Sequence, residues 1–232
     1  MKAIDEEKSV LRWGGLAGIL GGIIFILVFV VVIAFVGPDP AEPEGEVMRF
    51  PDIKAARTVE DSLYLVVLIL WVAHFLALYR GLRGTSLAPA LFGSVLGIVG
   101  LGVLAAGALP HVATAPISDL YHAPGANPED QATLVLMWQA TEGIFDALFG
   151  VGLLLVPIGF VALGVAMLGA PAFGRGFGGV SVVVGVVGVV AASILLVDPL
   201  SPSAFVGVLA LIAFHLVVGW KVYSLSRARG EP

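Results

Sequence analysis

A small group of carboxylate, imidazole and amide side chains has the chemistry to bind a cation or to move a proton. These groups stand out in an apolar chain, and they are Asp61, His111, Asp119, His122, Gln139, Glu142 and Asp146. Carboxylates and imidazoles are ligands for zinc and other divalent ions. His111, Asp119 and His122 could therefore form a metal site, although eleven positions separate the two histidines and no known ligand motif has that spacing.

The alternative interpretation is a solvated acidic rim at the outer face of a membrane. Asp61, Gln139, Glu142 and Asp146 would then lie near the ends of membrane helices. Glu142 and Asp146 are four residues apart, so a helix would hold both on one side. There they would face a shallow vestibule or hydrogen-bond to neighbouring helices.

Two further histidines, His74 and His215, lie inside long apolar runs. Each precedes a basic residue, Arg80 or Lys221, by six positions, so the two should lie at a similar depth on different helices. An ionisable group in hydrocarbon is costly unless it is paired, and two at one level could form a proton relay or line a polar cavity. The alternative is a pair of neutral imidazoles, each hydrogen-bonded to a backbone carbonyl or to a hydroxyl such as that of Tyr64.

Hydropathy indicates the elements that must position these groups. The chain of 232 residues is 59% hydrophobic and only 12% charged, and its mean hydropathy is +1.03. Its apolar blocks have the length of about 20 residues that spans the hydrocarbon layer as a helix. We expect one all-α membrane domain, a polytopic six-helix bundle with spans at 14–36, 62–79, 87–109, 147–168, 177–197 and 203–223.

The segments between the spans differ in character. Residues 131–168 contain no turn signal and exceed one crossing at about 1.5 Å per residue, so 131–146 should extend the fourth helix outward. Residues 37–60 and 110–131 contain four prolines each and should form irregular extracytoplasmic loops, with a short helix over 52–60 in the first. The first span is too long for a typical signal peptide and lacks a small-residue cleavage site, which favours a retained helix.

The distribution of lysine and arginine predicts the orientation. With the N-terminus in the cytoplasm, nine basic residues fall inside and three outside, as the positive-inside rule requires. An even number of spans then places both termini in the cytoplasm, and we expect a multi-pass protein of the cell membrane. The three outside residues are Arg49, Lys54 and Arg57.

Rows of glycine indicate close helix packing. Small residues spaced by four flatten one face of a helix so that another backbone can approach, and the rows are Gly14, Gly18 and Gly22, then Gly93 and Gly97, then Ser181 with Gly185. The plain interpretation is packing within one chain, and the alternatives are a homo-oligomer interface or a sliding contact in a transporter. Pro157, in the middle of the fourth span, removes a helix hydrogen bond and could act as a hinge.

Several functions are disfavoured. The chain has no cysteine, which excludes disulfides, thiol nucleophiles and thiolate metal sites. It contains no phosphate-binding glycine loop and no serine elbow, so classical enzyme chemistry is disfavoured, and no basic patch supports nucleic-acid binding. We expect no cofactor apart from the divalent metal considered above.

Three functions are compatible with these residues. The first is a structural or partner-binding membrane component, favoured because the spans contain so few polar groups; its partners would be the bilayer and, through the glycine rows, a second copy or another membrane protein. The second is a small-solute or proton-coupled transporter that uses His74, His215 and the outer-rim carboxylates. The third is a metal-dependent membrane enzyme.

The layout also resembles a bacterial and archaeal membrane family catalogued as domain of unknown function 4386. The resemblance is carried by the acidic segment after the first span, the basic turn LALYRGLRGTSLAPALFG, and the segment LLLVPIGFVALGVAMLGAPAFGRGFGGVSVVVGVVG. It implies six spans and no assigned activity, and it assigns no site residues.

Overall fold

The computed structural model describes residues 2–38, 40, 42–199 and 201–228, with side chains from residue 6 to residue 227. Six long helices account for most of this part of the chain, and all six are long and apolar enough to cross a membrane. The predicted all-α fold is therefore confirmed, together with six helices of membrane-spanning length and hydropathy, which indicate a multi-pass membrane protein. The helices are α1 (Lys2–Val31), α2 (Pro43–Leu82), α3 (Leu87–Tyr121), α4 (Pro128–Leu168), α5 (Arg175–Val197) and α6 (Ser203–Ala228), and the π-helical turn η1 (Val32–Val36) continues α1.

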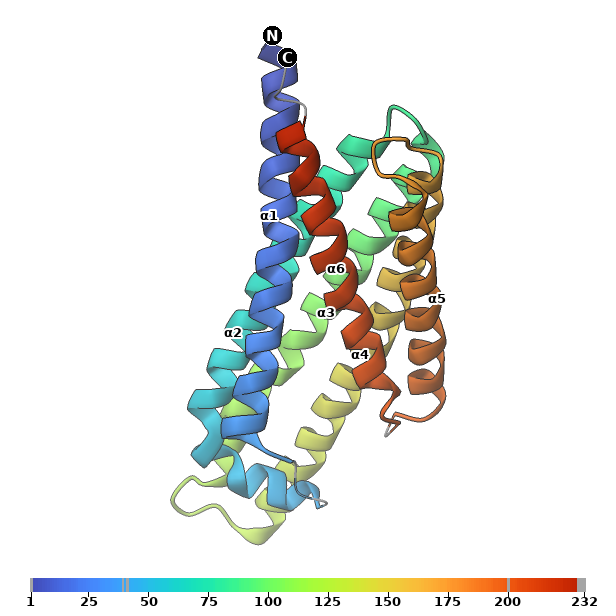
Figure 1. The fold of residues 1–232 in the computed structure, drawn as a ribbon. Helices are drawn as coiled ribbons and strands as arrows, with labels where there is room; N and C mark the ends of the chain where they lie inside the picture. The colour runs from blue at the N-terminus through green and yellow to red at the C-terminus, as the bar shows by residue number, and fades with distance from the viewer. Residues whose placement is uncertain (1, 39, 41, 200, 229–232) are drawn as a thin grey trace.

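The helices form a closed ring in chain order. Each helix packs against the next, and α6 returns to pack along α1 (Figure 1). Both ends of the described chain lie at one end of this bundle, and we call the opposite end the distal end. From the terminal end, α1 and α6 diverge toward the distal end (Figure 1).

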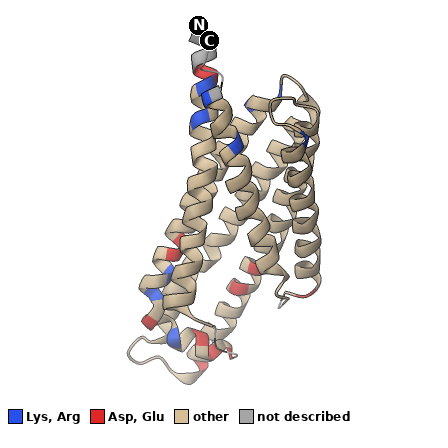
Figure 2. Ribbon diagram, in the orientation of Figure 1, with Lys and Arg blue, Asp and Glu red and all other residues tan. Residues whose placement is uncertain are grey.

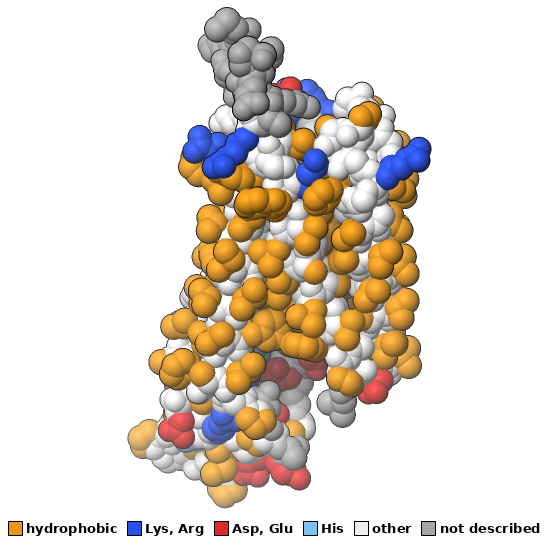
Figure 3. All heavy atoms as spheres, viewed as in Figure 1, with side chains coloured by type: hydrophobic (Ala, Val, Ile, Leu, Met, Phe, Trp, Pro, Cys, Tyr) orange, Lys and Arg blue, Asp and Glu red, His pale blue; other side chains and the backbone are white. Residues whose placement is uncertain are grey.

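The outer surface of the bundle is divided into a charged end, an apolar belt and a second charged end. Most Lys and Arg residues lie near the terminal end, while Asp and Glu residues lie mainly near the distal end (Figure 2). Between them lies a broad band of hydrophobic side chains (Figure 3). Large apolar residues such as Ile33, Ile69 and Val183 are exposed there. In water they would be unfavourable, and in a bilayer they contact lipid.

The predicted glycine rows lie at helix contacts within the chain. A Cβ atom added to Gly18 would lie 2.7 Å from Nδ1 of His74 in α2, and one added to Gly22 would lie 2.7 Å from Leu216 in α6. The other members pack equally closely across helix pairs: Gly14 on Ala77, Gly93 on the Gly159 carbonyl, Gly97 on Phe75 and Gly185 on the Pro157 carbonyl. These glycines therefore serve packing inside one chain.

The hinge candidate Pro157 lies in a packed part of α4. It is buried, and its ring and carbonyl face Gly188 and Gly185 of α5. The helix continues through it for eleven further residues, to Leu168. A hinge at Pro157 stays a prediction.

The long fourth helix is confirmed, whereas the expectation of two irregular loops is largely wrong. Residues 43–60 belong to α2 and residues 110–121 belong to α3, so Pro51, Pro110 and Pro116 lie inside helices. An internal proline removes one helix hydrogen bond, and tertiary packing compensates here. The extensions of α2, α3 and α4 share a small apolar cluster of their own: Val47, Phe50, Ile117, Tyr121 and Trp138.

Candidate functional site

The distal extensions of α2, α3 and α4 are fastened to one another by side chains. The Phe50 and Trp138 rings meet edge to face at 5.3 Å between centroids, and the indole of Trp138 donates a hydrogen bond to Glu46 at 2.9 Å. The hydroxyl of Tyr121 donates to Glu44 at 3.0 Å. The first turns of α2 are thereby held against α3 and α4, and the three helices enclose a space between them.

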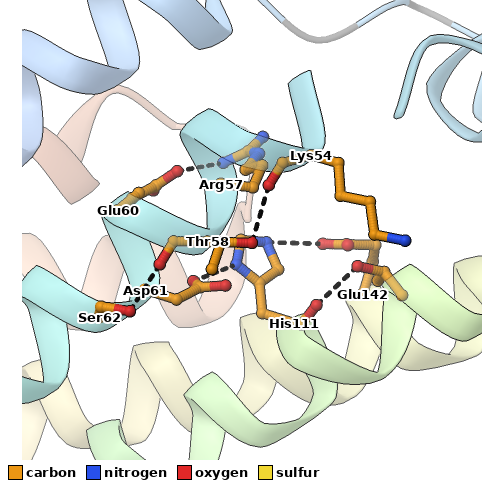
Figure 4. Close-up of polar contacts among 9 residues, drawn as sticks. Lys54, Arg57, Thr58, Glu60, Asp61, Ser62, His111 and Glu142 are labelled. Carbon is orange, nitrogen blue, oxygen red and sulfur yellow. Dashed lines mark hydrogen bonds and ion pairs between the residues drawn. The ribbon is translucent and has the colours of Figure 1, made fainter. Parts of the chain in front are cut away.

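His111 of α3 lies at the centre of this space, between carboxylates of two other helices (Figure 4). Its Nδ1 atom is 3.3 Å from Oδ1 of Asp61 in α2, and its Nε2 atom is 3.8 Å from Oε2 of Glu142 in α4. The imidazole also stacks on Phe145, with ring centroids 4.5 Å apart. A protonated imidazole can donate from both nitrogens, so it suits a position between two carboxylates.

His111 and Glu142 lie beyond the apolar parts of their helices, and their surroundings change their proton affinity. Burial alone would lower the pKa of His111, but the hydrogen bond to Asp61 and the charge of Glu142 outweigh it and raise the pKa above its ordinary value. Burial raises the pKa of Glu142, which the His111 charge offsets only in part. The pair therefore holds protons more tightly than free side chains do.

A cavity of about 770 Å³ opens around this cluster. Five carboxyl groups and two guanidinium groups line it, so its charge is negative when the carboxyl groups are ionised. Arg57 pairs with Glu60 at 3.0 Å, and Arg49 donates to the Pro38 carbonyl at 2.6 Å. Its charged lining residues are Glu46, Arg49, Arg57, Glu60, Asp61, His111, Glu142 and Asp146.

A second, apolar pocket of about 280 Å³ adjoins the first. The two share walls at Asp61, His111 and Phe145, so the charged cluster separates a polar space from an apolar one. Tyr64 also lines the apolar pocket. Its buried hydroxyl has no hydrogen-bond partner among the described residues.

The structure brings together most of the predicted rim residues. Asp61, Glu142 and Asp146 line the cavity with His111, whereas Gln139 points to the exposed side of α4. Sequence reasoning missed Glu46 and Glu60, because it treated residues 37–60 mainly as a loop. The one available signal was the alternation of charged and apolar residues in EVMRFPDIKAARTVED, which is compatible with a helix at a membrane surface.

The predicted metal set is not assembled in one place. Asp119 pairs with Lys54 at 2.8 Å, His122 Nδ1 lies 2.8 Å from the Ser118 carbonyl, and His111 contacts the carboxylates described above. Within the described part of the chain, no three His, Asp or Glu side chains are grouped as metal ligands.

The two intramembrane histidines do lie side by side, with ring centroids 5.2 Å apart. Both are fully buried. Nδ1 of His74 hydrogen-bonds the Gly14 carbonyl at 2.9 Å, as the neutral-imidazole alternative predicts, and His215 stacks on Trp71 at 4.1 Å. Phe75, Phe160 and Phe214 surround the pair, and neither histidine lines a cavity described above.

The chain matches no protein-family model, no curated protein and no solved structure with which it was compared. The resemblance to the family of domain of unknown function 4386 therefore stays a prediction.

Proposed function

We propose that this multi-pass membrane protein binds a small ligand in its distal cavity. The observation that carries the proposal is the cavity itself, about 770 Å³ in volume and lined by charged side chains of α2, α3 and α4. Small-molecule sites in proteins commonly enclose about 300–1,000 Å³ and combine apolar walls with a few polar groups. The structural or partner-binding membrane component that the sequence favours stays a prediction.

Binding without conduction is supported by the packing below the cavity. At the level of His74 and His215, six aromatic or imidazole rings fill the centre of the bundle, and the largest of them, Trp71, is 0% exposed. A water path would have to pass this cluster. The cavity is therefore a vestibule with a closed floor.

We also propose that the termini lie in the cytoplasm and the cavity on the outer side of the cell membrane. The accumulation of Lys and Arg at the terminal end supports this orientation through the positive-inside rule (Figure 2).

Single-cysteine variants test both proposals, because the natural chain has no cysteine. Asp146→Cys should react in intact cells with a membrane-impermeant thiol reagent. Glu129→Cys, on the exposed first turn of α4, is the positive control. Ser94→Cys, a nearly isosteric change of a side chain that is 3% exposed beside the aromatic cluster, should stay unlabelled.

An unreactive Asp146→Cys beside a reactive Glu129→Cys would refute the open cavity, and labelling of Ser94→Cys would refute the closed floor. If Glu129→Cys reacts only after the cells are permeabilised, the orientation is reversed.

A small-solute transporter is the second candidate, because His111 and the carboxylates around it are proton-binding groups in a cavity open at one end. In proteoliposomes the binding proposal predicts no movement of protons or methylammonium beyond that of protein-free vesicles. Movement that Asp146→Asn abolishes and Glu129→Gln leaves unchanged would favour the transporter.

A further inference from the structure

The polar cavity and the apolar pocket meet at one group of residues, and this junction defines the kind of molecule that fits both. Asp61, Glu60 and His111 belong to the lining of each space, together with Phe145 and Phe149. A ligand that fills both spaces must place a polar group among the carboxylates and an apolar group against the phenylalanines.

The charge of the polar end follows from the partners already present. The guanidinium of Arg57 is paired with Glu60, and that of Arg49 is bound by a backbone carbonyl. Asp146 lines the cavity, and no hydrogen bond or ion pair joins its carboxylate to another described residue. A cation would pair with this exposed carboxylate and lower the repulsion between neighbouring carboxylates, whereas an anion would increase that repulsion.

The apolar end is set by the second pocket, which lies between the diverging distal ends of α1 and α6. Phe29 of α1 and Phe205 of α6 meet edge to face across this gap at 5.9 Å between centroids. Both line the pocket, and Phe205 is 53% exposed on the surface of the apolar belt. Figure 3 shows acidic atoms at the bottom of a hollow below this belt. The pocket is therefore adjacent to the region that lipid would occupy.

Independent support comes from Tyr64, which lines the apolar pocket and whose buried hydroxyl has no hydrogen-bond partner in the described chain. A buried hydroxyl without a partner destabilises a folded protein, because the hydrogen bonds that it makes to water in the unfolded chain are not replaced. A bound molecule with a polar atom near the junction would supply the missing partner.

We propose that the two spaces together bind a single-chain cationic amphiphile, with its ammonium group among Asp61, Glu142 and Asp146 and its hydrocarbon chain between Phe29, Phe149 and Phe205. This inference rests on the proposed function, because it requires the distal cavity to be a ligand site. Ammonium N–H groups donate to carboxylates, and each methylene buried in the apolar pocket strengthens binding about threefold to fourfold.

The test is calorimetric titration of the purified protein in lipid nanodiscs with methylammonium, butylammonium and hexylammonium, and with hexanol and hexanoate. Empty nanodiscs provide the correction for partition into lipid. We expect affinity to rise from methylammonium to hexylammonium, and we expect hexanol and hexanoate to bind at least tenfold more weakly than hexylammonium. Equal binding of hexanol, or no gain with chain length, would overturn the proposal.

Two pairs of variants separate the head from the tail. Asp146→Asn should weaken the binding of every ammonium ligand by about the same factor. Glu129→Gln, which removes one exposed charge from the same helix, should not change these affinities. Ala204→Phe fills the apolar pocket and should abolish the increase in affinity from methylammonium to hexylammonium. Its control, Val206→Phe, adds the same ring at a side chain that is 43% exposed and outside the pocket lining.

The outcomes distinguish this inference from the proposed function. If Asp146→Cys is accessible to the thiol reagent but hexylammonium does not bind, the vestibule exists and the proposal of a cationic amphiphile as its ligand is wrong. If Asp146→Cys is inaccessible, both fail. If Ala204→Phe and Val206→Phe weaken the binding of hexylammonium equally, the hydrocarbon chain of the ligand does not bind in the apolar pocket.

Discussion

Replacing Gly159 with alanine tests a close backbone contact between α3 and α4 beneath the cavity. A Cβ atom on Gly159 of α4 would lie 2.7 Å from the carbonyl oxygen of Gly93 and 2.9 Å from the amide nitrogen of Gly97, both in α3. Ordinary contact begins near 3.4 Å, so α3 and α4 must separate by about 0.7 Å. A gap of about 0.5–1 Å loses a quarter to a half of the dispersion attraction between facing atoms.

The expected cost is the over-packing penalty of roughly 1–3 kcal/mol in the free energy of unfolding. Alanine also gains roughly 1 kcal/mol of intrinsic helix propensity over glycine, which would hide part of this cost. Gly143→Ala corrects for the gain, because Gly143 lies in the same helix and no atom lies within 4 Å of the place that its new methyl group would occupy. The difference between the two variants isolates the contact between α3 and α4.

The measurement is reversible unfolding in mixed micelles, followed by the loss of helical circular dichroism. We expect Gly143→Ala to be as stable as the natural chain or slightly more so, and Gly159→Ala to be less stable than Gly143→Ala by roughly 1–3 kcal/mol. If the two variants agree within about 0.5 kcal/mol, the reasoning from a backbone-to-backbone contact is refuted.

Three further predictions concern the polar groups. The pKa of His111 is raised in the folded protein, so its contribution to stability is fully present below the unfolded pKa and is lost as pH rises through the folded pKa. The free energy of unfolding should therefore fall with pH above about pH 6.5, and in His111→Gln this fall should be smaller when unfolding is measured at a series of pH values. His215→Leu should leave stability unchanged or increase it, because neither ring nitrogen has a hydrogen-bond partner in the described chain. His74→Leu should lower stability by about 1 kcal/mol, because it removes a hydrogen bond. Denaturation of both variants shows whether His74→Leu is the less stable of the two. Lys54→Met should change stability by less than about 1 kcal/mol, because the ion pair with Asp119 is solvent-exposed, and a larger loss would show that the pair fastens the distal end.

The parts of the fold that depend on hydropathy could be predicted from the sequence. A block of about 20 apolar residues has few alternatives to a spanning helix, and the continuation of α4 outward from residue 147 followed from the absence of a turn signal. The approach of His111 to Asp61 and Glu142 was also accessible in part. All three residues lie just past the ends of neighbouring spans, so they had to share one depth.

The parts that depend on tertiary packing could not be predicted. Pro110 and Pro116 favour irregular structure locally, and the helix persists there because Ile117 and Tyr121 are buried against α2 and α4. No periodicity in residues 37–60 reveals that Glu46 would meet Trp138, ninety-two positions further along the chain. The apolar pocket depends on the angle between α1 and α6, which hydropathy does not determine.

The unequal lengths of the helices explain why the site lies at the distal end. α2, α3 and α4 contain 40, 35 and 41 residues, whereas α5 and α6 contain 23 and 26. At about 1.5 Å per residue the three long helices exceed the hydrocarbon layer of about 30 Å by roughly 20–30 Å, while α5 and α6 barely exceed it. Charged side chains can therefore line the long helices just beyond the layer, where water stabilises them. The shorter neighbours end beside them, so in a bilayer lipid would lie along one side of the same site. A ligand with one charged and one apolar end would suit both surroundings.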